Sequence, residues 1–598
     1  MAEDTYSSNT SETSTRERPR SGAVDAVTLE ILSNRLLSVA EETGAVLIRT
    51  AYSTNIKERR DCSTAVFDAS GRMVAQAEQI PMHLGSLLGS VEATLSKYPP
   101  EALHPGDMFI ANDPYSGGGT HLPDIAVVTP VFVDDSIVGF IASIAHHADV
   151  GGKVPGSTSG DAVSIFQEGI RIPLVKLCDR GELVSDIVDF IALNSRTPSE
   201  REGDLAAQIA ANRVGARRLK EVVSHYGIEL FETISAALLD YAEAMMRAGI
   251  SKLKSGQYSF TDYLDDDGIN LGKPVPIKVT VTIEGDSATV DFDGSSPQVS
   301  GPINVPLNGT LATVFYCFKA LLGPDIPSNH GIYRVLRVVA PKGSIVNCLP
   351  PAPVGERIDT CQRIADAFFG AMTLAAPDRV LAASNSSVTT ATFSGTHPRT
   401  AAFYVYLETI AGGSGAHAHG DGLSGVQVHM TNTSNLAVEA LEREYPLLVD
   451  RYQFRIDSGG AGRYRGGLGI QRDIRALHDG VTFSGLADRQ KIAPWGIKGG
   501  MAGMTGRYLV WRNDGSETQL SSKASDILLK AEDVVSVQTP GSGGYGTPLD
   551  RDPQAVLRDV IEGKVSLIAA RDVYGVVLRD VPRSVDEEQT RQLRASRR

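Results

Sequence analysis

The sequence predicts an α+β protein of several domains, in which helices and β-sheets are mixed and the C-terminal part is rich in glycine and in β-structure. The chain has 598 residues, more than one hydrophobic core usually serves. Apolar residues recur at helical spacing in residues 24–51 and, with a break expected near Tyr226-Gly227, in residues 196–253, whereas residues 277–292 alternate as two paired strands would. Glycine clusters and short alternating runs then dominate residues 411–550.

These changes of pattern divide the chain into five predicted regions. Residues 1–22 are rich in Ser, Thr, Glu and Arg, and we expect them to form a disordered tail. We expect a metal-site domain with long helices in residues 23–255 and an α+β middle domain in residues 256–410. A glycine-rich β domain is predicted for residues 411–550, followed by a helical segment and tail in residues 551–598.

Composition excludes several classes of function. The chain has 57 basic and 71 acidic residues, a formal net charge of −14, which argues against nucleic-acid binding. No apolar run approaches the roughly 18 residues that a membrane span needs, and Met1–Gly22 has no apolar stretch typical of a secretory signal. The five cysteines include no C-x-x-C pair, which favours reduced thiols over a disulfide framework. We therefore expect a cytoplasmic protein with neither nucleic-acid nor membrane partners.

Ionisable residues gather at the ends of two β-type runs. The motif N-D-P-Y-S-G-G-G-T-H-L-P-D places His121 three residues before Asp124, and the next apolar run ends in His146 and His147. Ends of strands are places where a rigid scaffold presents reactive groups. Two imidazoles and a carboxylate that converge there would suit a divalent metal ion, for which we expect zinc or manganese.

Each motif also has a purely structural interpretation. A lone H-x-x-D is common, since many histidines are simply hydrogen-bonded polar groups. Two adjacent histidines at the end of an apolar strand are less usual, because both rings need partners there, and they strengthen the metal hypothesis. If successive residues of a strand face opposite sides, only one of His146 and His147 can reach the ion, and the sequence does not say which.

Two further carboxylates are candidate catalytic residues. Asp113 lies just upstream of the H-x-x-D motif, although an aspartate before a proline is commonly a turn residue. Glu168 follows a Gly/Ser-rich loop of the kind that often covers a binding site, and a solvent-facing glutamate is the alternative. Glu58, Arg60 and Asp61, in contrast, have the pattern of a surface ion cluster.

None of the glycine-rich runs has the pattern of a nucleotide-binding loop. The runs D-S-G-G-A-G-R-Y-R-G-G-L-G and T-P-G-S-G-G-Y-G lack G-x-x-x-x-G-K-[ST], and no G-x-G-x-x-G lies between a strand and a helix. His417 and His419 could bind a metal ion if they shared one face of a strand, but their glycine neighbours favour a flexible loop instead. Any use of ATP would therefore have to come from another chain.

Taken together, these segments resemble the hydantoinase B/oxoprolinase family from about Val24 to Leu578. Eight motifs in one order make the resemblance specific. They are N-I-K-E-R-R-D-C-S-T-A-V-F-D, I-P-M-H-L-G-S, N-D-P-Y-S-G-G-G-T-H-L-P-D, A-H-H-A-D-V-G-G, I-F-Q-E-G-I-R-I-P, G-D-L-A-A-Q-I-A-A-N, D-S-G-G-A-G-R-Y-R-G-G-L-G and T-P-G-S-G-G-Y-G.

The resemblance implies a metal-containing subunit that works with a hydantoinase A-type ATPase subunit in a hetero-oligomer. The partner would use ATP to phosphorylate a carbonyl or amide oxygen, or bicarbonate, and this chain would complete the reaction at the metal. By resemblance the ligands are His121, Asp124 and His146, with His147 as a competing third ligand.

The expected activity is ATP-dependent hydrolysis of a small cyclic amide: a hydantoin, N-methylhydantoin, oxoproline or lactam. Because the family resembles ketone carboxylases as well, a subunit of an ATP-dependent ketone carboxylase is one alternative. The other alternative is a non-catalytic scaffold for the ATPase subunit.

Overall fold

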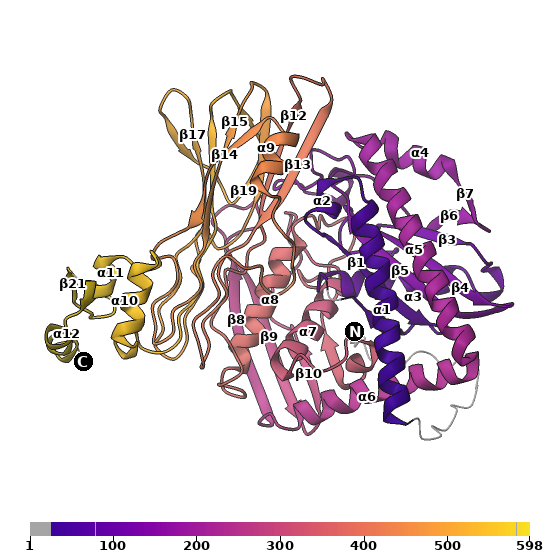
Figure 1. Ribbon diagram of the computed structural model, residues 1–598, viewed down its shortest axis with the longest axis horizontal. Coiled ribbons are helices and arrows are strands. Elements are labelled where there is room, and N and C mark those ends of the chain that lie inside the picture. The colour runs from indigo at the N-terminus through magenta and orange to yellow at the C-terminus, as the bar shows by residue number, and fades with distance from the viewer. Residues whose placement is uncertain (1–24, 78, 582, 598) are drawn as a thin grey trace. The chain divides into compact units, whose positions relative to one another are not determined.

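The computed structural model describes residues 25–77, 79–581 and 583–597, so the predicted tail at residues 1–22 lies outside the described residues. Helices are mixed with several mostly antiparallel sheets, which confirms the predicted α+β class (Figure 1). The chain forms two compact units, each assembled from three separate segments. One unit contains the described residues up to 257 together with residues 279–357 and 432–436, and the other contains residues 258–278, 358–431 and those from 437 onward.

A seven-stranded antiparallel sheet lies in the first unit, with strands in the order β2-β1-β5-β4-β3-β6-β7. Its strands are β1 (Cys62–Asp68), β2 (Met73–Gln76), β3 (Met108–Ala111), β4 (Asp124–Val133), β5 (Ser136–His146), β6 (Val175–Asp179) and β7 (Glu182–Leu183). Strands β1 and β3 are buried throughout, and β4 and β5 over most of their length. The sequences of β3, β4 and β5 are therefore mostly apolar runs instead of alternating ones, whereas β1 also buries the polar residues Ser63 and Thr64.

Two long helices, α1 (Ala26–Thr50) and α5 (Pro198–Tyr226), pack against each other and against this sheet (Figure 1). A β-carbon at Gly215 of α5 would lie 2.4 Å from Thr43 Oγ1 of α1 and 3.0 Å from Ile141 Cγ2 of β5. The missing side chain thus permits close three-way packing. None of the described helices combines the length and the apolar content that a membrane span requires.

Helix α5 ends at Gly227, whose φ of 83° is unfavourable for other residues, and α6 (Ile228–Ile250) begins there. The predicted helix break is therefore confirmed. Other elements of the first unit are α2 (Thr54–Lys57), α3 (His83–Lys97), η1 (Pro100–Ala102), η2 (Ile165–Gln167), α4 (Ser185–Leu193), α7 (Leu307–Leu322) and η3 (His330–Val335). Strand β10 (Ser287–Asp291) pairs antiparallel with β9 (Val275–Glu284), as predicted, and parallel with β11 (Leu336–Val339).

The second unit contains two antiparallel sheets, in the orders β13-β12-β16-β19 and β14-β15-β20-β17-β18. Phe483 of β16 packs against Tyr508 of β17 with ring centroids 5.7 Å apart, and buried Arg472 of β15 pairs with Glu408 of β13 at 3.1 Å. The two sheets therefore face each other, which confirms the predicted β-rich C-terminal part. The strands are β12 (Thr389–Thr396), β13 (Phe403–Ile410), β14 (Leu447–Phe454), β15 (Ile470–Ala476), β16 (Val481–Leu486), β17 (Arg507–Trp511), β18 (Glu517–Gln519), β19 (Lys523–Leu529) and β20 (Val534–Gln538).

Glycine-rich segments of the second unit pack backbone against backbone. A β-carbon at Gly415 would lie 1.8 Å from the carbonyl oxygen of Ala382, and one at Gly541 would lie 1.8 Å from that of Ser458. Any side chain at these positions would overlap the neighbouring chain. Close packing of extended segments therefore accounts for these glycines.

The predicted C-terminal tail is instead ordered over its described residues. After β21 (Leu578–Asp580) the chain forms β22 (Arg583–Val585) and α12 (Glu587–Ala595), and the Asp586 side chain caps α12. The guanidinium of Arg594 donates to the carbonyl of Arg551 at 2.7 Å. The remaining elements of this unit are β8 (Gly256–Leu264), α8 (Arg357–Met372), α9 (Val438–Glu444), η4 (Pro548–Asp550), α10 (Pro553–Ile561) and α11 (Leu567–Asp572).

Candidate metal centre

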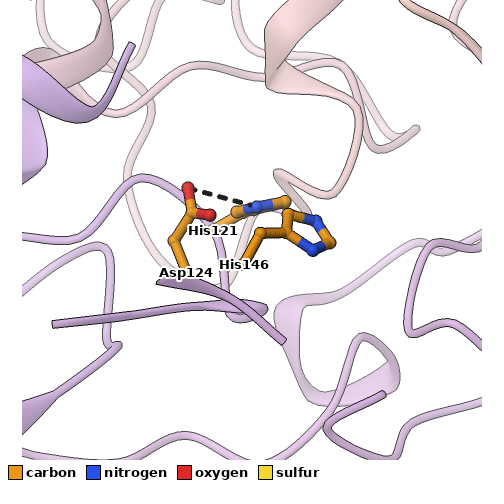
Figure 2. Close-up of side chains that lie close together, drawn as sticks. All are labelled: His121, Asp124 and His146. Atoms are coloured by element: carbon orange, nitrogen blue, oxygen red, sulfur yellow. Dashed lines mark ion pairs between the residues drawn. The ribbon is translucent and has the colours of Figure 1, made fainter. Parts of the chain in front are cut away.

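The structure brings three of the four predicted metal ligands together in the first unit, as Figure 2 shows. His121 Nε2 lies 3.2 Å from Asp124 Oδ2, and the ring centroids of His121 and His146 are 5.0 Å apart. One potential ligand atom from each side chain lies within 4.8 Å of the other two, and all three residues are buried. Within the described part of the chain, no other group of three such side chains has this spacing.

Strand register explains this convergence. Asp124 is the first residue of β4 and His146 is the last residue of β5, and the two are direct partners in the antiparallel ladder. His121 lies in the turn that enters β4, where its carbonyl accepts a hydrogen bond from the Asp124 backbone N–H at 3.3 Å. A hairpin and one turn therefore place all three side chains at the same end of the sheet.

His147 does not belong to this group. Its Nε2 lies 3.0 Å from Gln208 Oε1 on α5, and its backbone N–H donates to the Pro123 carbonyl at 2.8 Å. Successive residues of an extended chain face opposite sides, so His146 and His147 cannot both reach the cluster. The structure therefore places His146, and not His147, beside His121 and Asp124.

A second carboxylate and a further imidazole adjoin the cluster. His83 Nε2 lies 3.4 Å from Asp124 Oδ1 and 3.8 Å from Asp61 Oδ1, and all three side chains are buried. The pattern around Asp61 predicted a surface ion cluster, and for Asp61 that is wrong, because this residue precedes the buried strand β1. In the sequence, Asp61 lies in the motif R-R-D-C-S and His83 in the motif P-M-H-L-G-S. These motifs are the signals by which the two residues could have been found.

Three other groups hold the cluster from outside. Arg357 Nη2 donates to Asp124 Oδ2 at 2.7 Å, and the Asn55 amide nitrogen lies 3.0 Å from His146 Nδ1. The Gly355 carbonyl lies 3.4 Å from His121 Nδ1. None of these contacts is apparent from sequence spacing, because the partners come from distant segments.

The electrostatics favour a carboxylate with neutral imidazoles. Burial opposes ionisation of Asp124, but His121, His83 and Arg357 nevertheless hold its pKa well below the usual range. Burial, reinforced by Arg357, lowers the pKa of His121 to about 4, and burial with the neighbouring His121 lowers that of His146 well below normal. Near neutral pH these are the protonation states in which such side chains bind a cation.

Two atoms of the cluster have no hydrogen-bond partner among the described residues. They are His121 Nε2 and Asp124 Oδ1, both buried, whose contacts with Asp124 Oδ2 at 3.2 Å and with His83 Nε2 at 3.4 Å are ion-pair contacts that lack hydrogen-bond geometry. Buried polar atoms are nearly always hydrogen-bonded, so an orphaned imidazole nitrogen beside an orphaned carboxylate oxygen points to a ligand. Two imidazoles and one carboxylate fit a divalent transition metal that retains an open position for water or substrate.

The two candidate catalytic carboxylates have other partners. Asp113 accepts a hydrogen bond from Arg171 Nη2 at 3.0 Å. Burial raises the pKa of Glu168 to about 8, and its two oxygens accept backbone N–H groups of Val354 and Gly355 at 3.1 and 2.7 Å. Their catalytic roles therefore stay predictions.

We expect the metal-free protein to lose stability as the pH falls from about 6.5 to about 4. Burial lowers the pKa of both His121 and His147 to about 4, whereas an unfolded histidine titrates near 6.5. In this window the unfolded chain binds more protons than the folded one, so the free energy of unfolding decreases as the pH falls, by about 3 kcal/mol per histidine. Denaturant titrations of the chelated protein at several pH values measure this, and the His147→Gln variant should show a shallower dependence. Identical dependences would contradict the assignment to His147.

The chain belongs to the hydantoinase B/oxoprolinase family, whose family model matches residues 25–548. It is 40% identical over 576 residues to an uncharacterised protein of Methanocaldococcus jannaschii, covering 96% of this chain and 100% of that protein. It is 34% identical to the B-type subunit of a putative D-/L-hydantoinase from a Pseudomonas species, covering 96% and 98% of the two chains. The 5-oxoprolinase of Dictyostelium discoideum is 36% identical, and there the match covers 88% of this chain but 40% of the relative.

Two solved structures share the fold. The ATP-dependent caprolactamase of Pseudomonas jessenii has a TM-score of 0.88 at 30% identity, covering 96% of this chain and 100% of that one. The nucleotide-free acetone carboxylase has a TM-score of 0.89 at 21% identity, covering 95% of this chain and 82% of that one. The second similarity establishes the fold alone.

Proposed function

We propose that this chain is the metal-containing subunit of an ATP-dependent hydrolase that opens a cyclic amide. The observation that carries the proposal is the buried group of His121, Asp124 and His146 with its orphaned ligand atoms. The family membership, together with relatives named as a 5-oxoprolinase and as part of a putative hydantoinase, supports the substrate class. A zinc or manganese ion held by these residues would polarise a carbonyl group and lower the pKa of a bound water.

Other side chains would orient the ligands and carry protons. Arg357 fixes one oxygen of Asp124. His83 lies between Asp124 and Asp61, so it is placed to give or take a proton beside the cluster. Burial raises the pKa of Asp61, which suits a carboxyl group that exchanges a proton with its neighbour.

We propose that activation by ATP is supplied by a hydantoinase A-type ATPase subunit in a cytoplasmic hetero-oligomer. This chain has no loop of the Walker type, and the Dictyostelium 5-oxoprolinase extends well beyond the matched region. An amide is a poor electrophile, and O-phosphorylation would turn its oxygen into a leaving group. The partner subunit would then activate the amide, and this chain would open the ring.

The second candidate function is a subunit of an ATP-dependent ketone carboxylase. The observation that favours it is the fold shared with acetone carboxylase over 95% of this chain. In that reaction the same site would join activated carbon dioxide to the enolate of a ketone.

Co-purification with an A-type ATPase subunit tests both functions. We expect about one divalent ion per chain, and ATP-dependent ring opening of one member of a panel of hydantoins, oxoproline and lactams. The same preparation is then given acetone or acetophenone with labelled bicarbonate. Label retained in an acid product would overturn the hydrolase proposal in favour of the carboxylase, and a purified complex without metal would overturn both.

A further inference from the structure

Glu168 is a buried carboxyl group that holds one short segment of the first unit. This segment, residues 352–357, is called here the site strap. Glu168 Oε1 accepts the Gly355 N–H at 2.7 Å and Oε2 accepts the Val354 N–H at 3.1 Å. A β-carbon at Gly355 would lie 3.0 Å from Oε1, so the strap packs directly on the carboxyl group.

The site strap also supplies two of the groups that hold the candidate ligands. The carbonyl of Gly355 lies 3.4 Å from His121 Nδ1. Two residues later, Arg357 Nη2 contacts Asp124 Oδ2 at 2.7 Å, and its Nε contacts Thr120 Oγ1 at 3.2 Å. Glu168 therefore contacts the site strap, and the site strap in turn contacts His121 and Asp124.

We propose that Glu168 is a positioning residue for the metal ligands, which it orients through the site strap. By fixing Gly355, it places a carbonyl that accepts the Nδ1–H of His121, and this tautomer leaves Nε2 free for the cation. By fixing the backbone of Val354 and Gly355, it also positions Arg357, whose guanidinium orients Asp124. The inference rests on the proposed function, because it assumes a cation at this cluster.

The contact requires a side chain with two acceptors. Both oxygens of Glu168 receive backbone N–H groups, and each oxygen of a carboxyl group can accept whether or not the group is protonated, whereas the amide nitrogen of a glutamine can only donate. In Glu168→Gln the amide nitrogen would oppose the N–H of Val354 or Gly355, and the strap would move. Gly355→Ala would disturb the same contact, because the added β-carbon would lie 3.0 Å from Glu168 Oε1.

The test measures binding of Co²⁺ and Mn²⁺ to the full-length chain purified metal-free. Glu168→Gln should weaken the affinity about 10- to 100-fold, the usual effect of removing support from a metal ligand, and should shift the visible spectrum of the Co²⁺ form. Tyr115→Phe is the matched control. Its hydroxyl donates to the Ala352 carbonyl, at the opposite end of the strap from Gly355 and Arg357, which make the contacts with His121 and Asp124, so its loss should leave both readouts unchanged.

Gly355→Ala and the double variant provide the second line of evidence. If both substitutions act on one contact, the double variant should bind Co²⁺ no more weakly than the worse single variant. Unchanged affinity and spectrum in Glu168→Gln, whatever its melting temperature, would overturn the positioning role. A wild-type chain that binds neither ion would instead overturn the proposed function.

Discussion

His121→Ala is expected to remove the bound divalent ion and to reduce the ATP-dependent turnover of the complex roughly a thousand-fold or more. Two protein ligands would remain, and His146 and Asp124 alone offer an incomplete set for a transition metal. The buried Asp124 carboxylate would then have Arg357 as its closest cation. Elemental analysis of the purified complex, together with assays of product and phosphate release, measures both losses.

His147→Asn is the matched control for this prediction. It removes the neighbouring imidazole, whose ring faces Gln208, and should keep the metal content while lowering stability. Equal loss of metal in the two variants would contradict the choice of His146 over His147. Full turnover of a metal-free His121→Ala complex would favour the non-catalytic scaffold.

Arg489→Met is expected to lower the free energy of unfolding by roughly 3 to 5 kcal/mol. In the second unit, Arg489 Nη2 lies 2.7 Å from Asp262 Oδ2 and 2.8 Å from Asp366 Oδ2, and all three side chains are buried. Methionine fills a similar volume but leaves two buried carboxylates with less compensating charge. Chemical denaturation followed by circular dichroism measures the change.

Lys491→Met supplies a control two residues away. Lys491 pairs with Asp266, but half of its side chain is exposed to solvent, so the pair is screened. We expect a loss of about 0 to 1 kcal/mol. Comparable losses in the two variants would mean that the buried charges of Arg489 are not what stabilises this unit.

Local sequence patterns predicted the elements whose causes are local. The break at Gly227 follows from a conformation that glycine adopts easily, and the β9–β10 hairpin follows from strict alternation. The H-x-x-D and H-H motifs contain the three side chains that the structure brings together in the candidate site. The choice of His146 depended on which side of β5 each ring faces, and that is fixed only by the pairing of β5 with β4.

Features with distant causes could not be predicted in the same way. Asp61 looked like a surface residue because its neighbours are charged, and its burial beside His83 depends on how β1 and α3 pack. The glycine at 415 is required by the carbonyl of Ala382, which belongs to a different segment of the chain. Such contacts become visible only when the chain is folded.

Each unit is built from segments that are far apart in the sequence, because the chain passes from one unit to the other several times. This limits how the protein can be cut into fragments. A break at residue 257, 357 or 436 would separate segments that belong to the same compact unit. A fragment that begins or ends at one of these residues would expose apolar surface that the missing segment normally covers. We expect such a fragment to aggregate when it is produced alone. Two fragments made in the same cell could restore the native arrangement by complementation, so a split chain is better studied as a reassembled pair than as autonomous parts.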